Sequence, residues 1–463
     1  MTTTFALLLL ALAAPAASAA AASPSSLRLV SPRSYQVFQR DDLDVADIAV
    51  AGRAVGLGRE LEVRWGNEPW TPIACRADGT FAVQLGGRTV GQATLWVRSA
   101  ARHDIVISRP YVGVGDIYVI AGQSNASGRG ASPNWYTHPV LAAALFGNDD
   151  RWKELLDPVD AATGQVDRVS ADTQAGGSVW PLLATRLMAA EGVPVAFVPC
   201  AKGTTPIKRW VEDVAAPQSP ATLYGSMLRR VRAVGGRVRA VLFWQGEADA
   251  RRLTSTEAYA AQLQSLAAAL ARDCGAPLVA AQLGDYDTPR YSHAGVDAIR
   301  LAQQQAWSAG WALPGPALYD IDLHGQVHFM AWKDELVAAR RWAAAILAGV
   351  FHREVPAAPR LRSARYDGGL VVTLNFDCAG ASLRSGQVGG VVLHAAGYPA
   401  QLTASVTATD TVTLLLAAPV LEPLTVSLGS GREAAGQPVP VEGSPWALPA
   451  QLFIDARVVT VPE

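Results

Sequence analysis

The sequence predicts an α/β domain built on a parallel sheet, with a β-sandwich domain on either side of it. Three observations lead to this fold class. A chain of 463 residues is too long for one ordinary hydrophobic core, so two or three domains are expected. Residues 113–352 alternate apolar strand-like runs with helical stretches. The β-rich runs of residues 25–112 and 356–463 are short and separated by turn residues.

Composition excludes two classes of partner. Half of the chain is hydrophobic and its formal net charge is −1 at pH 7. A nearly neutral protein has no electrostatic attraction for polyanions, so we expect no nucleic-acid partner. Past the N-terminus, no run is long and apolar enough for a transmembrane helix, so we expect no membrane span. The oligomeric state is not determined by these features.

Residues 1–22 are predicted to be a signal peptide, because a short apolar run is followed by small residues. Ala17-Ser18-Ala19 fits a signal-peptidase site, and Pro15 interrupts the apolar run. The segment before the run lacks Lys and Arg, which leaves an alanine-rich tail as the alternative. A signal peptide implies a secreted or periplasmic protein.

The two flanking segments are predicted to form β-sandwiches. Residues 25–112 contain runs such as "LRLVSP", "ELEVRWG" and "ATLWVRSA", separated by Gly, Pro, Asn or Asp. β signals return in residues 356–463 with "GGLVVTLNF" and "TASVTATDTVTLLLA", after a linker at "AAPRLR". Each flanking domain is open to two interpretations, structural support or glycan binding.

The central domain is predicted to place strands at "DIYVIAG", "PVAFVPC", "AVLFWQG" and "PLVAAQLG". Their continuous apolar character indicates a parallel sheet with both faces covered by helices. One helix begins with Pro181, whose missing N–H is not needed in the first turn, and stops at Gly192. In such sheets, reactive groups gather at the carboxyl ends of the strands.

The four cysteines lack the close spacing of a metal site. Cys200 ends one predicted strand and Cys274 precedes another, and these positions are expected at opposite edges of the sheet, beyond disulfide reach. We interpret the thiols mainly as small core residues, with no assignment for Cys75 and Cys378.

A serine follows the first central strand in "GDIYVIAGQSNASGRG". Gly122 permits a tight turn before Ser124, and the next residues are expected to enter a helix whose N-terminal amides favour developing negative charge. A nucleophilic hydroxyl needs exposure, a fixed direction and nearby N–H donors. By itself the motif is equally compatible with ordinary turn chemistry.

Two further strand ends carry groups suited to the same chemistry. In "VPCAKGTTPIKRW", Gly203 offers a backbone N–H after the strand has ended. In "VLFWQGEAD", Gln245 supplies a neutral amide donor for an oxyanion, and Glu247 lies two residues on. Burying an amide and a carboxylate at a strand end is costly without partners, which favours a site over a solvated loop.

The candidate general base is His328, on the segment before the last helix of the central domain. In this position its imidazole can reach the candidate serine. The chain order, with the serine first and the histidine last, is consistent with both residues belonging to one catalytic domain. The alternative is a metal site made by His324 and His328 with Asp320 and Asp322. Two histidines four residues apart converge only on a helix, and Gly325 argues against a helix here.

Five motifs occur in order along the central domain: "GQSN", "GGSVWPLLATRL", "VPVAFVPCAKGTTPIKRW", "WQGEAD" and "VHF" before a final helix. Together they resemble the SGNH-type hydrolase superfamily, and more closely the carbohydrate acetylesterases that include sialate O-acetylesterases and acetyl-xylan esterases. The resemblance covers most of residues 113–350. It implies a flavodoxin-like three-layer αβα domain that requires no metal and no organic cofactor.

The same resemblance implies roles for individual residues. Ser124 is the expected nucleophile and His328 the expected base. The expected oxyanion hole combines the backbone amides of Ser124 and Gly203 with the side chain of Gln245, which takes the place of the superfamily's Asn. Neighbouring polar side chains are expected to support the site or to contact substrate: Gln123, Asn125 and Glu247.

The group that orients His328 departs from the family pattern. The family has Asp three residues before the catalytic His, and Gly325 occupies that position here. Asp322 is our preferred substitute among side chains, and the alternatives are Asp320, Glu247 and the carbonyl of Gly325. A neutral acceptor would stabilise an imidazolium less than a carboxylate would.

Two further features concern the surroundings of the site. Trp244 stands where the family commonly has His, so the floor of the site is expected to differ. A cationic and aromatic cluster is open to two interpretations, a grip on a sugar or a solvated loop around one packed Trp: Lys202, Lys208, Arg209 and Trp210.

These observations predict a secreted serine esterase that removes O-acetyl groups from a carbohydrate. One alternative is a catalytically impaired glycan-binding protein, which the missing Asp before the His keeps open. Another is a short-chain esterase acting on non-sugar esters, and a metal hydrolase is the third. Neither the sugar nor the acetylated hydroxyl is identified by these motifs.

Overall fold

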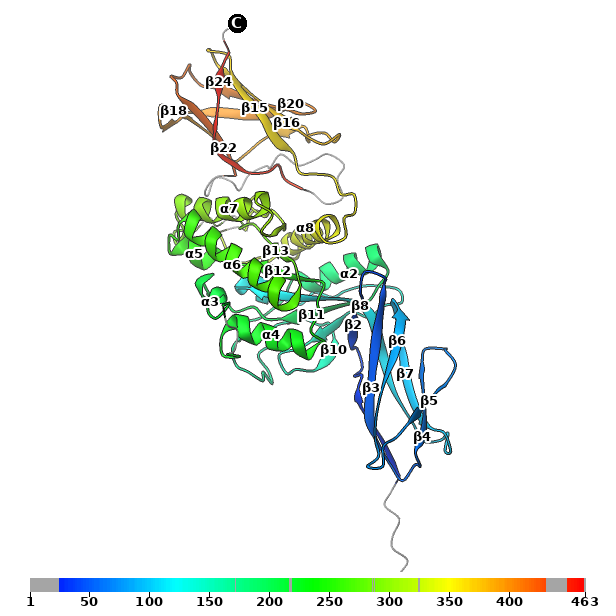
Figure 1. Ribbon diagram of the computed structural model, residues 1–463. Helices are drawn as coiled ribbons and strands as arrows, with labels where there is room; N and C mark the ends of the chain where they lie inside the picture. The colour runs from blue at the N-terminus through cyan, green and yellow to red at the C-terminus, as the bar shows by residue number, and fades with distance from the viewer. Residues whose placement is uncertain are drawn as a thin grey trace, which may run out of the picture.

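The structure is a computed structural model that describes residues 25–170, 172–215, 219–284, 286, 288–323, 325–429 and 448–461. The predicted signal peptide and His324 lie outside the described residues. Three units follow one another along an elongated molecule: an N-terminal β unit, a central α/β unit and a C-terminal β unit (Figure 1).

Two sheets form the N-terminal unit. Its strands are β1 (Ser26–Ser31), β2 (Val37–Gln39), β3 (Val45–Val55), β4 (Glu60–Trp65), β5 (Thr71–Ala74), β6 (Thr80–Thr89), β7 (Gly91–Ser99) and β8 (Val106–Gly122). One sheet has the order β1-β3-β6, and the other joins β5, β4, β7 and β2 to β8. Their inward side chains share one buried cluster that includes Leu29, Val50, Leu61 and Val97, because apolar residues alternate along the strands.

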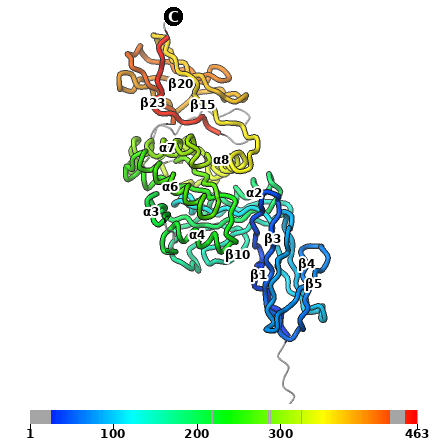
Figure 2. Tube along the Cα trace, in the orientation of Figure 1, coloured from blue at the N-terminus to red at the C-terminus, as the bar shows by residue number. Residues whose placement is uncertain are grey.

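Strand β8 belongs to both the N-terminal and the central unit. Its first half pairs with β7 from Val106 to Val114, and its second half is a central strand of the parallel sheet. The boundary predicted between residues 112 and 113 therefore falls inside a continuous strand. Figure 2 traces this passage from the blue N-terminal strands into the central unit.

The central sheet has the order β10-β9-β11-β8-β12-β13-β14. Its further strands are β9 (Ala144–Phe146), β10 (Trp152–Glu154), β11 (Val195–Pro199), β12 (Ala240–Trp244), β13 (Leu278–Ala280) and β14 (Leu313–Pro314). All neighbouring pairs are parallel except β10 with β9. The four predicted central strands correspond to the second half of β8 and to β11, β12 and β13.

Helices cover this sheet on both faces. They are α1 (Ser124–Ser127), α2 (Trp180–Glu191), α3 (Lys208–Val211), α4 (Leu223–Ala233), α5 (Glu247–Arg251), α6 (Thr256–Cys274), α7 (His293–Ser308) and α8 (Trp332–Gly349). α2 contacts α8 on one face, while α4, α6 and α7 form a connected group on the other (Figure 1). The predicted ends of α2 are confirmed, with Pro181 in the first turn and Gly192 as a left-handed C-cap.

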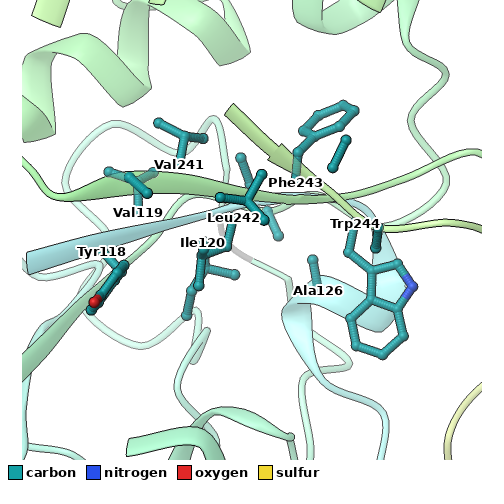
Figure 3. Packing of buried hydrophobic residues seen from close by; sticks show 14 of the residues in the cluster. Tyr118, Val119, Ile120, Ala126, Val241, Leu242, Phe243 and Trp244 are labelled. Carbon is teal, nitrogen blue, oxygen red and sulfur yellow. The ribbon is translucent and has the colours of Figure 1, made fainter. Parts of the chain in front are cut away.

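The core of the central unit lies between these layers. Every residue of β11 and β12 is buried, and so is the second half of β8. Ile120 and Leu242 are partners on adjacent strands and lie next to each other in Figure 3, with Trp244 at the end of its strand. The well-packed core therefore fixes the positions of the strand ends that carry the candidate reactive groups.

The C-terminal unit also has two sheets around one core. Its strands are β15 (Arg360–Tyr366), β16 (Val371–Asp377), β17 (Gly386–Gln387), β18 (Val391–Ala395), β19 (Tyr398–Pro399), β20 (Leu402–Ala408), β21 (Thr411–Leu416), β22 (Leu424–Leu428), β23 (Phe453–Arg457) and β24 (Val459–Thr460). All four cysteines are free thiols. No helix within the described ranges has both the length and the apolar character needed to cross a membrane.

Candidate active site

Ser124 lies directly beyond the end of β8, at the carboxyl edge of the parallel sheet. The turn that presents it depends on Gly122, whose φ is 127° and whose added Cβ would lie 2.0 Å from the carbonyl oxygen of Trp244. That carbonyl accepts a hydrogen bond from the backbone N–H of Gln123 at 3.0 Å. The close approach of β8 and β12 thus fixes where the serine emerges, although α1 is a single turn rather than a longer helix.

His328 meets this serine. Its Nε2 lies 3.0 Å from Oγ of Ser124, on the loop just before α8. Burial lowers the pKa of His328, the nearby cation of Arg129 lowers it further, and the carboxylate of Asp172 opposes both effects. A neutral imidazole at hydrogen-bonding distance from a hydroxyl can act as a general base.

Asn125 holds the segment that carries His328. Its Nδ2 donates to the carbonyl of Val327 at 3.1 Å, and its Oδ1 accepts from the backbone N–H of Phe329 at 3.4 Å. The residues on either side of the histidine are therefore bound to the neighbour of the serine. This amide positions the two candidate catalytic groups relative to each other.

Glu247 is the second anchor of Asn125. The carboxylate is buried and accepts from Nδ2 of Asn125 at 2.6 Å and from the hydroxyl of Tyr286 at 2.8 Å. Burial raises the pKa of Glu247. Gln123 supports the same region, because its Oε1 accepts from the backbone N–H of Ala248 at 3.1 Å. Both residues act behind the site and hold its loops together.

The side chain of Gln245 is bonded to acceptors within the protein. Its side chain is fully buried, and its Nε2 donates to Asp249 at 2.7 Å, to the carbonyl of Thr205 at 3.0 Å and to Gln123 at 3.2 Å. Both amide hydrogens therefore have acceptors within the protein. Gln245 is thus a buried link between neighbouring loops, and its part in an oxyanion hole stays a prediction.

Gly203 has an unexpected neighbour. Its backbone N–H donates to Oδ2 of Asp172 at 3.2 Å, and the same oxygen pairs with Nη2 of Arg129 at 2.5 Å. A Cβ at Gly203 would lie within 2.8 Å of both groups, so the Arg129 and Asp172 side chains would have to shift to admit a larger residue. Sequence reasoning missed both charged residues. Arg129 gave a weak signal as a charge among small residues near Ser124, and Asp172 gave none.

The carboxylates considered for orienting His328 lie in different parts of the structure and have different partners. Asp320 is buried in a bidentate ion pair with Arg341, and Glu247 bonds to Asn125 and Tyr286. Asp322 is exposed on the loop before His328. Among the described residues, no carboxylate lies within 4.0 Å of the His328 ring nitrogens, so the role of Asp322 stays a prediction.

The cationic cluster divides into two parts. Trp210 is fully buried and packs edge-on against Phe243, with ring centroids 5.7 Å apart, so it cannot stack on a sugar. Lys208 and Arg209 are exposed on α3, and Arg209 pairs with Glu212. The interpretation as a solvated segment around one packed Trp fits these contacts. Within the described ranges, no three His, Cys, Asp or Glu side chains are grouped as metal ligands would be.

Comparisons with known proteins identify relatives of the central unit. Residues 114–312 match the model of a carbohydrate esterase family described as sialic acid-specific acetylesterase. A probable carbohydrate esterase of Arabidopsis thaliana is 30% identical over 180 residues, which are 35% of this chain. This alignment spans 65% of that relative's length.

One solved structure shows a similar fold. A carbohydrate acetylesterase from Xanthomonas citri is similar over 93% of this chain and 99% of its own, with a TM-score of 0.59 at 21% identity. A structure of an Arabidopsis thaliana protein covers 51% of this chain at 21% identity, with a TM-score of 0.39. Ser124, Gly203 and Glu247 lie inside the segment matched by the family model, and His328 follows it. Residues 114–312 of this chain are thus similar to the carbohydrate esterase family of sialic acid-specific acetylesterases.

Proposed function

We propose that this protein is a serine esterase that removes O-acetyl groups from a carbohydrate through an acetyl-enzyme on Ser124. The observation that carries the proposal is the 3.0 Å contact between Oγ of Ser124 and Nε2 of His328 at the carboxyl edge of the sheet. The family match of residues 114–312 supports an acetylated carbohydrate as the substrate class. We also infer that the central unit is an SGNH-type hydrolase domain between two β-sandwich domains, and that residues 1–22 direct export to the periplasm or the exterior.

The reaction follows from the two side chains. Oγ of Ser124 attacks the acetyl carbonyl carbon while Nε2 of His328 accepts the hydroxyl proton. The C–O bond to the sugar then breaks, and the imidazolium returns its proton to the departing sugar oxygen. Water attacks the acetyl group on Ser124, giving its proton to His328, and acetate leaves as the serine oxygen is reprotonated.

The tetrahedral oxyanion requires N–H donors, and the backbone amides of Ser124 and Gly203 are the proposed ones. In the resting structure the Gly203 amide donates to Asp172. The substrate oxygen therefore replaces this carboxylate when the intermediate forms. Asp172 remains paired with Arg129, so its negative charge still has a partner after the Gly203 amide has turned to the substrate oxygen.

The central test is acetate release by Ser124→Ala. A 4-nitrophenyl acetate assay on this variant is expected to show a loss of about 1000-fold or more, because no other group can carry the acetyl. Ser265→Ala, an exposed serine on α6, is the matched control and is expected to retain full turnover. Equal turnover of Ser124→Ala and the parent protein would remove this serine from the mechanism.

Substrate class is tested separately, by acetate release from O-acetylated sialic acid, acetylated xylan and long-chain aryl esters. Release from a sugar in preference to the long-chain esters supports the proposal. A parent protein that hydrolyses none of these esters yet binds the glycans would instead be the catalytically impaired glycan-binding protein.

A further inference from the structure

The described residues expose two tryptophans, and both lie beside the candidate catalytic centre. Trp135 is 64% exposed and Trp332 is 59% exposed, and together with Met330 they line a cavity of about 1120 Å³. The cavity lies between the loop of residues 131–137, the outer face of α2 and the first turn of α8. Large aromatic side chains left on a surface mark binding sites, because they contribute nothing to the core there.

This cavity is continuous with the segments that carry the candidate catalytic residues. Met330 lies two residues after His328, and its carbonyl accepts from the backbone N–H of Ala131 at 3.1 Å. Ala131 belongs to the segment that leaves Ser124 through Arg129. Met330 and Trp332 therefore place one end of this cavity on the segment that also carries His328.

A second cavity, of about 550 Å³, extends the first one toward the N-terminal unit. Both cavities are lined by Trp135 and Thr137, and the second is also lined by Tyr35, Tyr111 and Tyr136. We call the two cavities together the aromatic groove. It leads from the candidate catalytic loop to the junction with the N-terminal β unit.

Two tyrosines at the far end of the groove are held in a costly backbone conformation. Tyr35 has a φ of 63° and Tyr111 a φ of 58°, in the left-handed region that residues other than glycine rarely adopt. Their rings stack with centroids 4.7 Å apart and planes 22° apart. Such strain persists where a side chain must be presented in one direction, and here it presents a stacked pair beside the second cavity.

The polar groups of the groove fit a neutral ligand. Glu154 accepts from the hydroxyls of Tyr136 and Tyr35, and Glu335 accepts from Asn134 in the first cavity. Glu154 disfavours a polyanionic chain in the second cavity, while in the first cavity Glu335 shares the lining with the cation of Arg186. Arg186 also lines the first cavity, and its Nε is buried without an acceptor among the described residues.

We propose that the aromatic groove binds the chain of an O-acetylated neutral polysaccharide, so that the enzyme recognises several sugar units beyond the one that carries the ester. Pyranose rings have apolar faces that stack on Trp and Tyr, and their hydroxyls hydrogen-bond at the rim. Binding at such remote positions lowers the barrier at the ester by fixing its orientation. This inference rests on the proposed acetylesterase function.

The first experiment measures kcat and KM separately for acetate release from acetylated xylo-oligosaccharides of one to six units and from acetylated xylan and glucomannan. KM is expected to fall with chain length until the groove is filled, by about tenfold or more from one unit to six. Equal KM values for the monosaccharide and the hexasaccharide, for every sugar tested, would overturn the proposal.

The second experiment compares Trp135→Ala and Trp332→Ala with Tyr398→Ala, a control that removes a 77% exposed aromatic side chain from the C-terminal unit. For each protein, kcat/KM on the polymer is divided by kcat/KM on 4-nitrophenyl acetate. The ratio is expected to fall about tenfold for each groove variant and to stay at the parent value for the control. Unchanged ratios in both groove variants would overturn the proposal.

Failure of the esterase function itself has a different signature, namely no acetate from any substrate. In that case the groove is tested by affinity electrophoresis of the parent protein in gels that contain xylan or glucomannan. Retardation that Trp135→Ala abolishes supports the groove as a polysaccharide site, and no retardation in either gel overturns it.

Discussion

Asn125 donates a hydrogen bond of 2.6 Å to the buried carboxylate of Glu247, and the same side chain binds the backbone on both sides of His328. The residue after the candidate nucleophile thus determines where the candidate base lies. Because the bonds run to the backbone of residues 327 and 329, the imidazole itself is left to face Ser124.

Replacing Asn125 by Ala is expected to lower kcat on 4-nitrophenyl acetate by about 10- to 100-fold, with little change in KM. The reason is that the histidine loop loses its link to the serine, and a displacement of about 1 Å costs about this much. Steady-state kinetics measures kcat and KM separately for the parent and the variant. Glu247→Gln keeps an oxygen that can accept from Asn125, so its loss is expected to be smaller. A kcat for Asn125→Ala equal to the parent value, in a protein with an unchanged thermal melt, would refute this role.

The acidic limb of the pH–rate profile is expected to have its midpoint below the ordinary histidine pKa of about 6.5. His328 must be neutral to accept the proton, and burial together with Arg129 lowers its pKa. Arg129→Met removes the cation while Asp172 remains, so the pKa of His328 rises and the midpoint moves to higher pH. The profile of kcat/KM on an aryl acetate between pH 4 and 9 measures the midpoint for the parent protein and for Arg129→Met. A midpoint shifted toward lower pH in the variant would contradict the assignment.

Glu335 is expected to make stability depend on pH. Burial raises the pKa of Glu335 to about 7 in the folded protein, above its ordinary value of 4.5. Between these values the folded protein holds a proton that the unfolded chain has lost, so the free energy of unfolding falls as pH rises through this window.

Glu335→Gln removes this dependence. The variant is expected to unfold with a free energy up to about 3 kcal/mol higher than the parent at pH 8, and the difference should vanish below about pH 4.5. Chemical denaturation at both pH values measures it. Glu354→Gln, an exposed substitution, is the control and should match the parent throughout. A variant less stable than the parent at pH 8 would contradict the prediction.

Gly122→Ala is expected to prevent correct folding of the central unit or to cost about 4 kcal/mol or more, because the new Cβ meets the Trp244 carbonyl oxygen at 2.0 Å. Gly192→Ala is the matched control. It also has a positive φ, 69°, but no atom lies within 4 Å of its added Cβ. Its expected cost is about 1 kcal/mol, from the backbone conformation alone. Similar melting temperatures for the two variants would show that the close approach is unimportant.

Local signals explain which parts of this molecule can be predicted from its sequence. Helix α2 carries its own start and stop in Pro181 and Gly192, and the buried strands are recognisable as apolar runs. The meeting of Ser124 and His328 follows from chain order and from the rule that strand ends gather at one edge. These features depend on neighbouring residues or on topology.

Side-chain direction at a strand end could not be predicted in this way. Gln245 follows β12 as expected, yet acceptors from Thr205 and Asp249 turn its amide inward. The ion pair of Arg129 with Asp172 joins residues 43 positions apart and has no periodic pattern. Strand β8 continues across the predicted domain boundary. The composition of the strand does not change at the point where its partner changes from β7 to β11 and β12, so its sequence gives no sign of the change.

The shared strand has a consequence for any shortened form of the enzyme. A fragment that begins at residue 113 would strip β7 from one edge of β8 and would open the apolar side of Val114 to water. The first two units therefore form a single structural module, which a cut at residue 113 would disrupt. The C-terminal unit keeps a core of its own but also contacts the central unit, because Arg300 donates to the carbonyl of Gly429 at 2.7 Å and Tyr319 packs against Leu452. Removal of the C-terminal unit would therefore take away a buried hydrogen-bond acceptor from the central unit.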